Sequence, residues 1–120
     1  MKEKPKEKID IKELLKNLIK LLEKKEAIDT VVLDMSKTRL LTDYFVICTA
    51  NSNIHMKSLR NDVVEFFQDN GKELIYYDKG DNYDWLLIDA GDVVVHIFTK
   101  SAREFYDLEH LWLDVERIVL

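Results

Sequence analysis

Apolar residues recur at helical spacing in two stretches of the chain. In the first stretch, five apolar residues share one face of a helix: Ile11, Leu14, Leu15, Leu18 and Leu22. Asp10 and Glu13 form an N-terminal capping pattern, and Lys24 and Lys25 suit the C-terminal end of a helix. The pattern therefore predicts an amphipathic helix at the start of the folded chain.

The second helical stretch follows Ser52 or Asn53, either of which can cap a helix. Its apolar positions again share one face: Met56, Leu59, Val63, Phe66 and Phe67. Asn70 and Gly71 end the pattern, because glycine suits the left-handed residue that commonly follows a helix.

Five short apolar or β-branched runs predict strands: residues 28–34, 44–49, 73–77, 85–89 and 93–98. The last two runs flank Ala90-Gly91, a pair that suits a tight hairpin turn. A capping box over residues 101–104 predicts a last helix through Phe105, Leu108 and Trp112. The order α, β, β, α, β, β, β, α predicts an α/β fold: a five-stranded mixed sheet with flanking helices and some antiparallel pairing.

The predicted hairpin has one aliphatic face and one mixed face. A two-residue loop at Ala90-Gly91 pairs Asp89 with Asp92, Leu87 with Val94, and Trp85 with His96. One face is then aliphatic: Leu86, Ile88, Val93, Val95 and Ile97. The other face combines aromatic and charged residues with aliphatic ones: Trp85, Leu87, Asp89, Asp92, Val94, His96 and Phe98. The mixed face is either a recognition patch or lies under a second layer, and for His96 we favour a structural, semi-buried side chain.

Length and composition indicate one domain. We expect residues 1–8, a charged lead that contains the only proline, to be disordered, and residues 9–120 to form a single α/β domain. No apolar run approaches the length of a membrane span, and the first ten residues resemble neither a secretory signal nor a transit peptide. The single cysteine, Cys48, excludes an internal disulfide, so we expect a cytoplasmic protein.

The net charge of −5 is unevenly distributed. Residues 1–26 contain nine lysines and six acidic residues, whereas residues 27–120 contain nine basic and seventeen acidic residues, a balance of −8. An acidic body repels phosphate backbones, which disfavours direct nucleic-acid recognition by that body and suits a basic protein partner. Solubility alone would also explain this charge.

Candidate metal sites are weak. Asp92 and His96 lie four residues apart on one strand, about 13 Å, which is too far to share a metal ion. Asp89 and Asp92 could hold Mg²⁺ at the turn. A metal-dependent nucleotidyltransferase or phosphohydrolase that uses these two carboxylates is therefore the alternative function.

Candidate nucleophiles are equally weak. Cys48 lies in an apolar strand, which favours a small buried hydrophobe over a reactive thiol. Ser52 and His55 lie at a helix start with no evident third group to orient them. The three glycines are isolated, so no phosphate-binding motif is present. We therefore expect neither enzymatic activity nor a cofactor.

The last predicted helix places Tyr106, Glu109 and Trp112 at positions i, i+3 and i+6. They either form an exposed aromatic–acid stripe or leave Trp112 to cover the core. Arg103 can pair with Asp107 one helical turn away.

These segments together resemble the ribosomal silencing factor family (RsfS, also called Iojap-like) from about residue 28 to residue 112. The most specific parts are residues 43–47, the helix start at Ser52 and His55, Trp85, and residues 89–98 (DAGDVVVHIF) and 103–112 (REFYDLEHLW). The chain departs from the family at Ala50 and Ile54, where glycine and a basic residue are usual. It departs again at residues 78–80, which replace the usual Glu-Gly.

The resemblance implies a nucleotidyltransferase-like fold that has lost catalysis. It further implies binding to the large ribosomal subunit through ribosomal protein L-fourteen, which would block docking of the small subunit and repress translation when nutrients are short. Members of the family are commonly homodimers. A factor for large-subunit assembly would use the same surface and remains a further alternative.

We expect the hairpin and the last helix to present six partner-binding residues: Trp85, Leu86, Asp92, His96, Tyr106 and Glu109. Trp85 is the expected apolar anchor, because buried aromatic residues usually dominate binding energy. Four further residues are expected to shape the site: Asp89, Gly91, Arg103 and Trp112.

Overall fold

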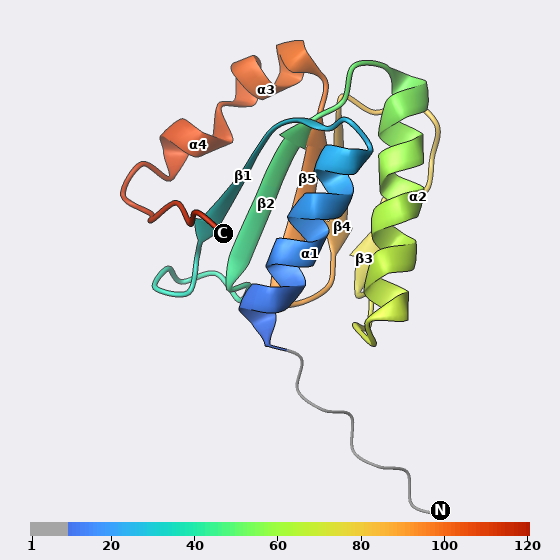
Figure 1. The fold of residues 1–120 in the computed structure, drawn as a ribbon. Coiled ribbons are helices and arrows are strands. Elements are labelled where there is room, and N and C mark those ends of the chain that lie inside the picture. The colour runs from blue at the N-terminus through green and yellow to red at the C-terminus, as the bar shows by residue number, and fades with distance from the viewer. Residues whose placement is uncertain (1–9) are drawn as a thin grey trace, which may run out of the picture.

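A five-stranded mixed sheet forms the centre of the computed structural model, which describes residues 10–120 (Figure 1). Its strands, in chain order, are β1 (Ile28–Asp34), β2 (Tyr44–Thr49), β3 (Tyr76–Tyr77), β4 (Trp85–Asp89) and β5 (Val93–Phe98). Across the sheet they lie in the order β1-β2-β5-β4-β3, with β2 and β5 parallel and the other neighbours antiparallel. The predicted five-stranded mixed sheet is confirmed. The predicted disordered lead, residues 1–8, lies outside the described residues.

Two helices, α1 (Ile11–Lys24) and α2 (Asn53–Asp69), lie side by side over one face of the sheet (Figure 1). The Asp10 carboxylate accepts a hydrogen bond from the amide two residues on at 3.1 Å, and the Ser52 hydroxyl accepts one from the His55 amide at 3.0 Å. These bonds satisfy amide groups that the first turn of a helix leaves without a partner. Both helices therefore begin where the sequence predicts.

The main hydrophobic core lies between these helices and the sheet. The helices contribute Leu14, Leu15, Leu18, Leu22, Met56, Leu59, Val63 and Phe67, and the sheet contributes Val32, Val46, Cys48, Leu86, Ile88, Val93, Val95 and Ile97. Truncating one such buried leucine to alanine typically costs about 2–5 kcal/mol. The aliphatic face predicted for the hairpin is thus confirmed as core.

The hairpin between β4 and β5 has a different register from the predicted one. Asp89 pairs with Val94, and the amide of Ala90 donates to the carbonyl of Val93 at 2.9 Å, so the two-residue loop is Gly91-Asp92. Gly91 takes the first loop position with φ of +92°, where its amide donates to the Asp89 carboxylate at 2.8 Å. The predicted pairs were wrong, because each residue of β4 pairs with a residue two positions further along β5 than predicted. Side chains on a strand alternate between the two faces, so a shift of two residues leaves each residue on its predicted face.

Two short helices, α3 (Lys100–Tyr106) and α4 (Leu108–Leu111), replace the single last helix that the sequence predicts. The capping box over residues 101–104 is wrong, because the hydroxyl of Thr99 caps α3 by accepting from the Ala102 amide at 3.2 Å. The chain then breaks at Asp107, whose φ of 45° and ψ of 54° are left-handed. This break turns α4 away from the direction of α3.

The second face of the sheet is covered mainly over β1, β2 and β5. Its apolar cluster contains Leu33, Met35, Phe45, Ile47, Val94, Phe98, Ala102 and Leu108, with Trp112 and Val115 packed against it. The tail continues along the free edge of β1, where the amide of Ile118 donates to the carbonyl of Val32 at 3.0 Å. The apolar tail therefore packs on this chain up to Ile118, whereas Val119 is exposed.

The strand predicted over residues 73–77 contains only two residues, Tyr76 and Tyr77. This strand lies at the edge of the sheet and pairs on one side alone, with β4. Residues 73–75 are not part of the strand, although the Ile75 amide still donates a hydrogen bond to the Asp89 carbonyl at 2.8 Å. Within residues 10–120, no helix is long and apolar enough to cross a membrane.

The left-handed backbone of Asp107 leads to a prediction about stability. Asp107→Ala should lower the free energy of unfolding by about 1 kcal/mol relative to Asp107→Gly, because glycine adopts left-handed backbone without steric cost. Both variants lose the same exposed carboxylate, so their difference isolates the backbone. Urea denaturation measures it, with Asp114→Ala as the control for a lost surface acid. Equal stability of the alanine and glycine variants would contradict the left-handed corner.

Candidate functional site

Three aromatic side chains gather where β5 ends and α3 begins. The Trp85 ring packs on Phe98 with ring centres 5.0 Å apart and contacts the Tyr106 ring at 4.8 Å. Phe105 meets the Tyr106 ring edge to face at 5.1 Å and remains 80% exposed. We call Trp85, Phe105 and Tyr106 the aromatic platform. Trp85 and Tyr106 were among the predicted contacts, whereas Phe105 was not.

A hydrogen bond beneath the platform fixes the orientation of Trp85. The indole Nε1 donates to Nδ1 of His96 at 3.0 Å, so Nδ1 has no proton and the ring is neutral with its proton on Nε2. His96 is only 4% exposed and meets the Phe45 ring at 4.4 Å. Burial lowers the pKa of His96 to about 4, since a charged imidazole would lose its water. The histidine therefore supports Trp85 from inside the protein.

The six predicted partner contacts do not converge on one surface. Leu86 is fully buried in the main core and His96 lies inside the second cluster, so neither reaches the surface. Asp92 lies at the far end of β5 from the platform, about 20 Å away along the strand, and its carboxylate pairs with the Lys72 ammonium at 2.6 Å. Of the predicted contacts, only Trp85 and Tyr106 belong to the platform.

Glu109 is held in a bidentate ion pair with Arg103. The guanidinium Nη2 lies 2.8 Å from Oε2 and Nε lies 3.2 Å from Oε1, and hydrogen bonds from Arg103 lower the pKa of the Glu109 carboxyl. Nη1 of Arg103 also donates to the Thr49 hydroxyl at 3.0 Å. The predicted pair of Arg103 with Asp107 is wrong, because the left-handed backbone of Asp107 directs that carboxylate toward His110.

The aromatic–acid stripe predicted for the last helix does not form. Tyr106, Glu109 and Trp112 no longer share one face, because the chain breaks between the first residue and the other two. Trp112 packs against the second apolar cluster, which agrees with the alternative that it covers the core.

A cleft of about 950 Å³ opens beside Arg103 at the carboxyl ends of the parallel strands β2 and β5. Ligands of open α/β sheets commonly bind at such strand ends. Its walls combine residues from four segments of the chain: Asp29, Thr49, Asn51, Ser52, Lys100, Arg103, Glu104 and Arg117. Both charge signs line the cleft, and Arg103 already donates hydrogen bonds to Glu109, Thr49 and the carbonyl of Ile28. The sequence could not predict it because the segments are distant along the chain.

The Ser52–His55 pair at the rim of this cleft has structural partners. The imidazole Nδ1 accepts from the Asn51 amide at 3.0 Å, and Nε2 donates to the Lys25 carbonyl at 2.8 Å. His55 thus ties the end of α1 to the start of α2, and its ring has no free nitrogen to activate a nucleophile. Cys48 is buried, and burial raises the pKa of its thiol to about 12.

The two turn carboxylates are also engaged with the protein. Asp89 accepts from the Gly91 amide and Asp92 pairs with Lys72, as described above. Across residues 10–120, no cluster of three or more histidine, cysteine, aspartate or glutamate side chains is arranged to hold a metal ion.

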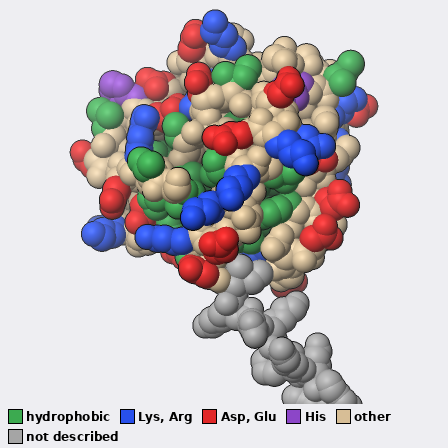
Figure 2. All heavy atoms as spheres, viewed as in Figure 1, with side chains coloured by type: hydrophobic (Ala, Val, Ile, Leu, Met, Phe, Trp, Pro, Cys, Tyr) green, Lys and Arg blue, Asp and Glu red, His purple; other side chains and the backbone are tan. Residues whose placement is uncertain are grey.

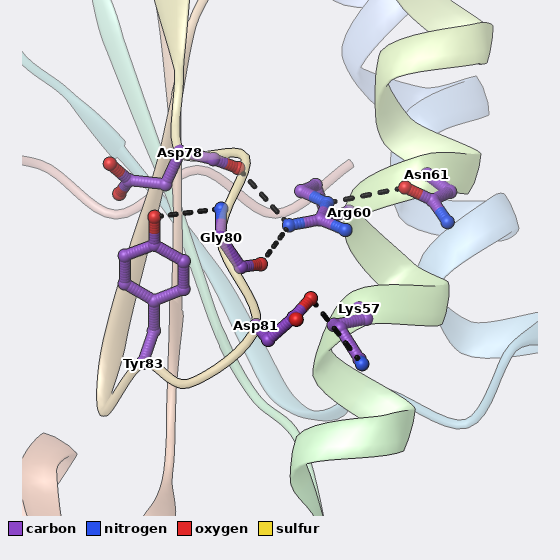
Figure 3. Close-up of polar contacts among 7 residues, drawn as sticks. All are labelled: Lys57, Arg60, Asn61, Asp78, Gly80, Asp81 and Tyr83. Atoms are coloured by element: carbon purple, nitrogen blue, oxygen red, sulfur yellow. Dashed lines mark hydrogen bonds and ion pairs between the residues drawn. The ribbon is translucent and has the colours of Figure 1, made fainter.

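The loop that leads into Trp85 is held by a buried arginine (Figure 3). Arg60, on α2 and 8% exposed, donates from Nη1 to the carbonyl of Gly80 at 2.7 Å and to that of Asp78 at 3.3 Å. The Asp78 carboxylate in turn accepts from the Leu87 amide at 2.8 Å, which joins the loop to the middle of β4. Arg60 therefore holds the loop from the helix side of the sheet.

Comparison with known proteins gives consistent matches. Residues 8–120 match the family model described as "Ribosomal silencing factor during starvation". The chain is 37% identical over 103 residues to the ribosomal silencing factor RsfS of Bacillus subtilis (strain 168), which covers 86% of this chain and 87% of that protein. A crystal structure of a protein from Chromobacterium violaceum is similar with a TM-score of 0.80 and 35% identity, covering 87% of each chain.

A more distant relative has a different name. The chain is 31% identical over 98 residues to the Mus musculus protein "Mitochondrial assembly of ribosomal large subunit protein 1". The match covers 79% of this chain and 43% of the mouse protein.

Burial of neutral His96 predicts an acid-sensitive stability. The folded state depresses the pKa from 6.5 to about 4, so the unfolded chain binds the proton first as pH falls. The free energy of unfolding should be highest above about pH 6.5 and lose about 2 kcal/mol by about pH 5. Urea denaturation across this range measures the loss, and His96→Gln, which retains an acceptor for Trp85, should flatten it. A wild-type stability that stays constant over this range would contradict a buried neutral His96.

The hydrogen bonds of Arg60 in Figure 3 lead to a prediction about the loop before β4. Arg60→Met should increase amide hydrogen exchange in residues 78–84 at least tenfold, because each lost charged hydrogen bond costs about 1.5–3 kcal/mol. Lys57→Met is the matched control on α2, since Lys57 makes only an exposed ion pair to Asp81 at 3.7 Å. Equal exchange in the two variants would show that Arg60 does not hold the loop.

Proposed function

The chain belongs to the ribosomal silencing factor family, and from this premise we propose that it binds the large ribosomal subunit through ribosomal protein L-fourteen. The bound protein then blocks docking of the small subunit and so represses translation. It acts in the cytoplasm, as a homodimer when free, and it has no catalytic activity of its own. Blocking of this kind requires that the protein binds tightly and fills the space that the small subunit would occupy, but it requires no catalytic group at the interface.

The aromatic platform is the observation that supports a docking surface. Protein interfaces concentrate binding energy in a few aromatic residues set among neutral or polar contacts. Phe105 is 80% exposed and Tyr106 is 48% exposed, which leaves much apolar area for a partner to cover. Trp85 beneath them is fixed by Phe98 and His96, so little conformational freedom is lost on binding.

The charges around the platform favour a basic partner. Exposed Asp84 precedes Trp85 on one side, and exposed Glu104 precedes Phe105 on the other. Residues 27–120 have a charge balance of −8, which would speed the encounter with a basic ribosomal protein. Asp92 and Glu109 add to this field, although each is already paired within the chain.

Assembly of the large subunit is the second candidate function. The mouse relative is named for that role, and an assembly factor would bind the same particle. The two functions differ in their consequence: silencing lowers the yield of joined ribosomes from mature subunits, whereas an assembly role leaves immature large subunits when the protein is absent.

Co-sedimentation with purified large subunits tests the proposal, followed by addition of small subunits. The protein should travel with the large subunit and lower the yield of joined ribosomes. Failure to co-sediment would contradict the proposed function for this chain.

Phe105→Ala tests the platform as the docking surface. The variant should weaken large-subunit binding at least tenfold, because an exposed aromatic at an interface centre carries much of the binding energy. Its exposed side chain lets the fold survive truncation, whereas Trp85→Ala would also remove packing against Phe98. Leu41→Ala is the matched control, since Leu41 is fully exposed in the β1–β2 loop at the other end of the sheet. Wild-type affinity of the Phe105 variant would exclude the platform.

A further inference from the structure

The outer face of α1 carries four lysines at intervals of four residues. Lys12, Lys16, Lys20 and Lys24 are all exposed. Four residues of α-helix rise about 6 Å, so the charges follow one another at about that spacing over roughly 18 Å. We call these four residues the lysine stripe. The same interval extends in the sequence to Lys4 and Lys8.

None of the stripe lysines forms an ion pair within residues 10–120. Other lysines of the chain form ion pairs: Lys25 with Asp62, Lys57 with Asp81 and Lys72 with Asp92. None of the ion pairs within the described residues includes a lysine of the stripe, although Glu13 and Glu23 lie on the same helix. Like charges four residues apart destabilise a helix by about 0.2–0.5 kcal/mol per pair. The arrangement is therefore unfavourable for an isolated helix and favourable for binding a polyanion.

We propose that the lysine stripe binds the phosphate backbone of RNA. A row of lysines can contact successive parts of a nucleic-acid backbone, because each lysine meets a phosphate as a compact point charge. The contact reads no sequence, because phosphates position a protein without specifying bases. The first 26 residues, which contain the stripe, have a charge balance of +3, whereas the balance of −8 belongs to residues 27–120.

The surroundings of the stripe disfavour a protein or a membrane as the occupant. None of the exposed large apolar residues of the described chain lies on α1, so a protein partner would find no apolar centre there. The apolar face of α1 is buried against the sheet through Leu14, Leu15, Leu18 and Leu22, so it cannot enter a lipid surface. Only charge is available on this face.

The stripe and the aromatic platform occupy different sides of the molecule. α1 covers one face of the sheet (Figure 1). Trp85 and Phe98 belong to the apolar cluster on the other face. Figure 2 shows the α1 side, where basic side chains run across the surface over α1. If the proposed function holds, the RNA is ribosomal and adds a second, salt-sensitive contact. Binding of free RNA does not depend on that function.

The experiment compares two variants with the same net charge. Lys16→Gln, Lys20→Gln and Lys24→Gln together remove most of the stripe, and Lys37→Gln, Lys57→Gln and Lys79→Gln together remove three surface charges elsewhere. Fluorescence anisotropy with a short labelled single-stranded RNA, over a KCl series, gives affinity and its salt dependence for the full-length protein. Vesicles containing anionic phospholipid and a polyglutamate peptide serve as competing polyanions.

The stripe variant should bind the RNA at least tenfold more weakly than wild type. The slope of log affinity against log salt should become shallower by about 2 in magnitude. Each phosphate contact on a single strand contributes about 0.7 to this slope, and the variant loses three lysines. The control should retain wild-type affinity and slope. Equal loss in both variants, no RNA binding by wild type, or preference for the vesicles or the peptide would overturn the proposal.

Large subunits distinguish this inference from the proposed function. Wild type that binds free RNA through the stripe but does not co-sediment with large subunits would leave the inference standing and remove the proposed function. The opposite result has two parts: the wild type co-sediments with large subunits, and the stripe variant binds RNA and subunits as the wild type does at every salt concentration. That result would leave the proposed function standing and remove the inference.

Discussion

Burial of β5 on both faces is the constraint on which the rest of the structure depends. All six of its residues are buried, at the centre of the sheet. Val93, Val95 and Ile97 face the layer of α1 and α2, while the alternate residues face the second cluster. A strand with two buried faces is stable only when both layers are in place, which ties the last helices to the main core. The same constraint places His96 away from water and thereby keeps its ring neutral and able to accept from Trp85.

Hydrophobic periodicity was sufficient to predict the elements of the main core. The apolar face of α1, the cap at Ser52 and the bounds of β1, β2, β4 and β5 agree with the structure, because each depends on residues close together in the chain. The turn register was not determined in this way, since Gly91 suits either position of a two-residue loop. The strand pairing and the bond from the Gly91 amide to Asp89 distinguish the two registers. The break at Asp107 was missed because aspartate, unlike glycine, gives no clear signal of left-handed backbone.

The candidate site was harder to predict because its contacts join distant segments. Arg103 meets Thr49 across 54 residues of sequence, and Arg60 reaches Gly80 across 20. Neither separation leaves a periodic signal. The resemblance to a family predicted a partner but did not determine which side chains face it. Leu86, on the aliphatic face of the hairpin, and His96 lie inside, whereas Phe105, one position from predicted Tyr106, is exposed.

The buried thiol has a practical consequence for work on this protein. Cys48 is the only cysteine, it lies in the main core, and a pKa of about 12 leaves almost no thiolate at neutral pH. The native protein should therefore be inert toward maleimides and iodoacetamide while folded. A cysteine introduced at any exposed position would be the sole reactive thiol, so a crosslinker or spin label could be attached at one chosen point without first removing the natural residue.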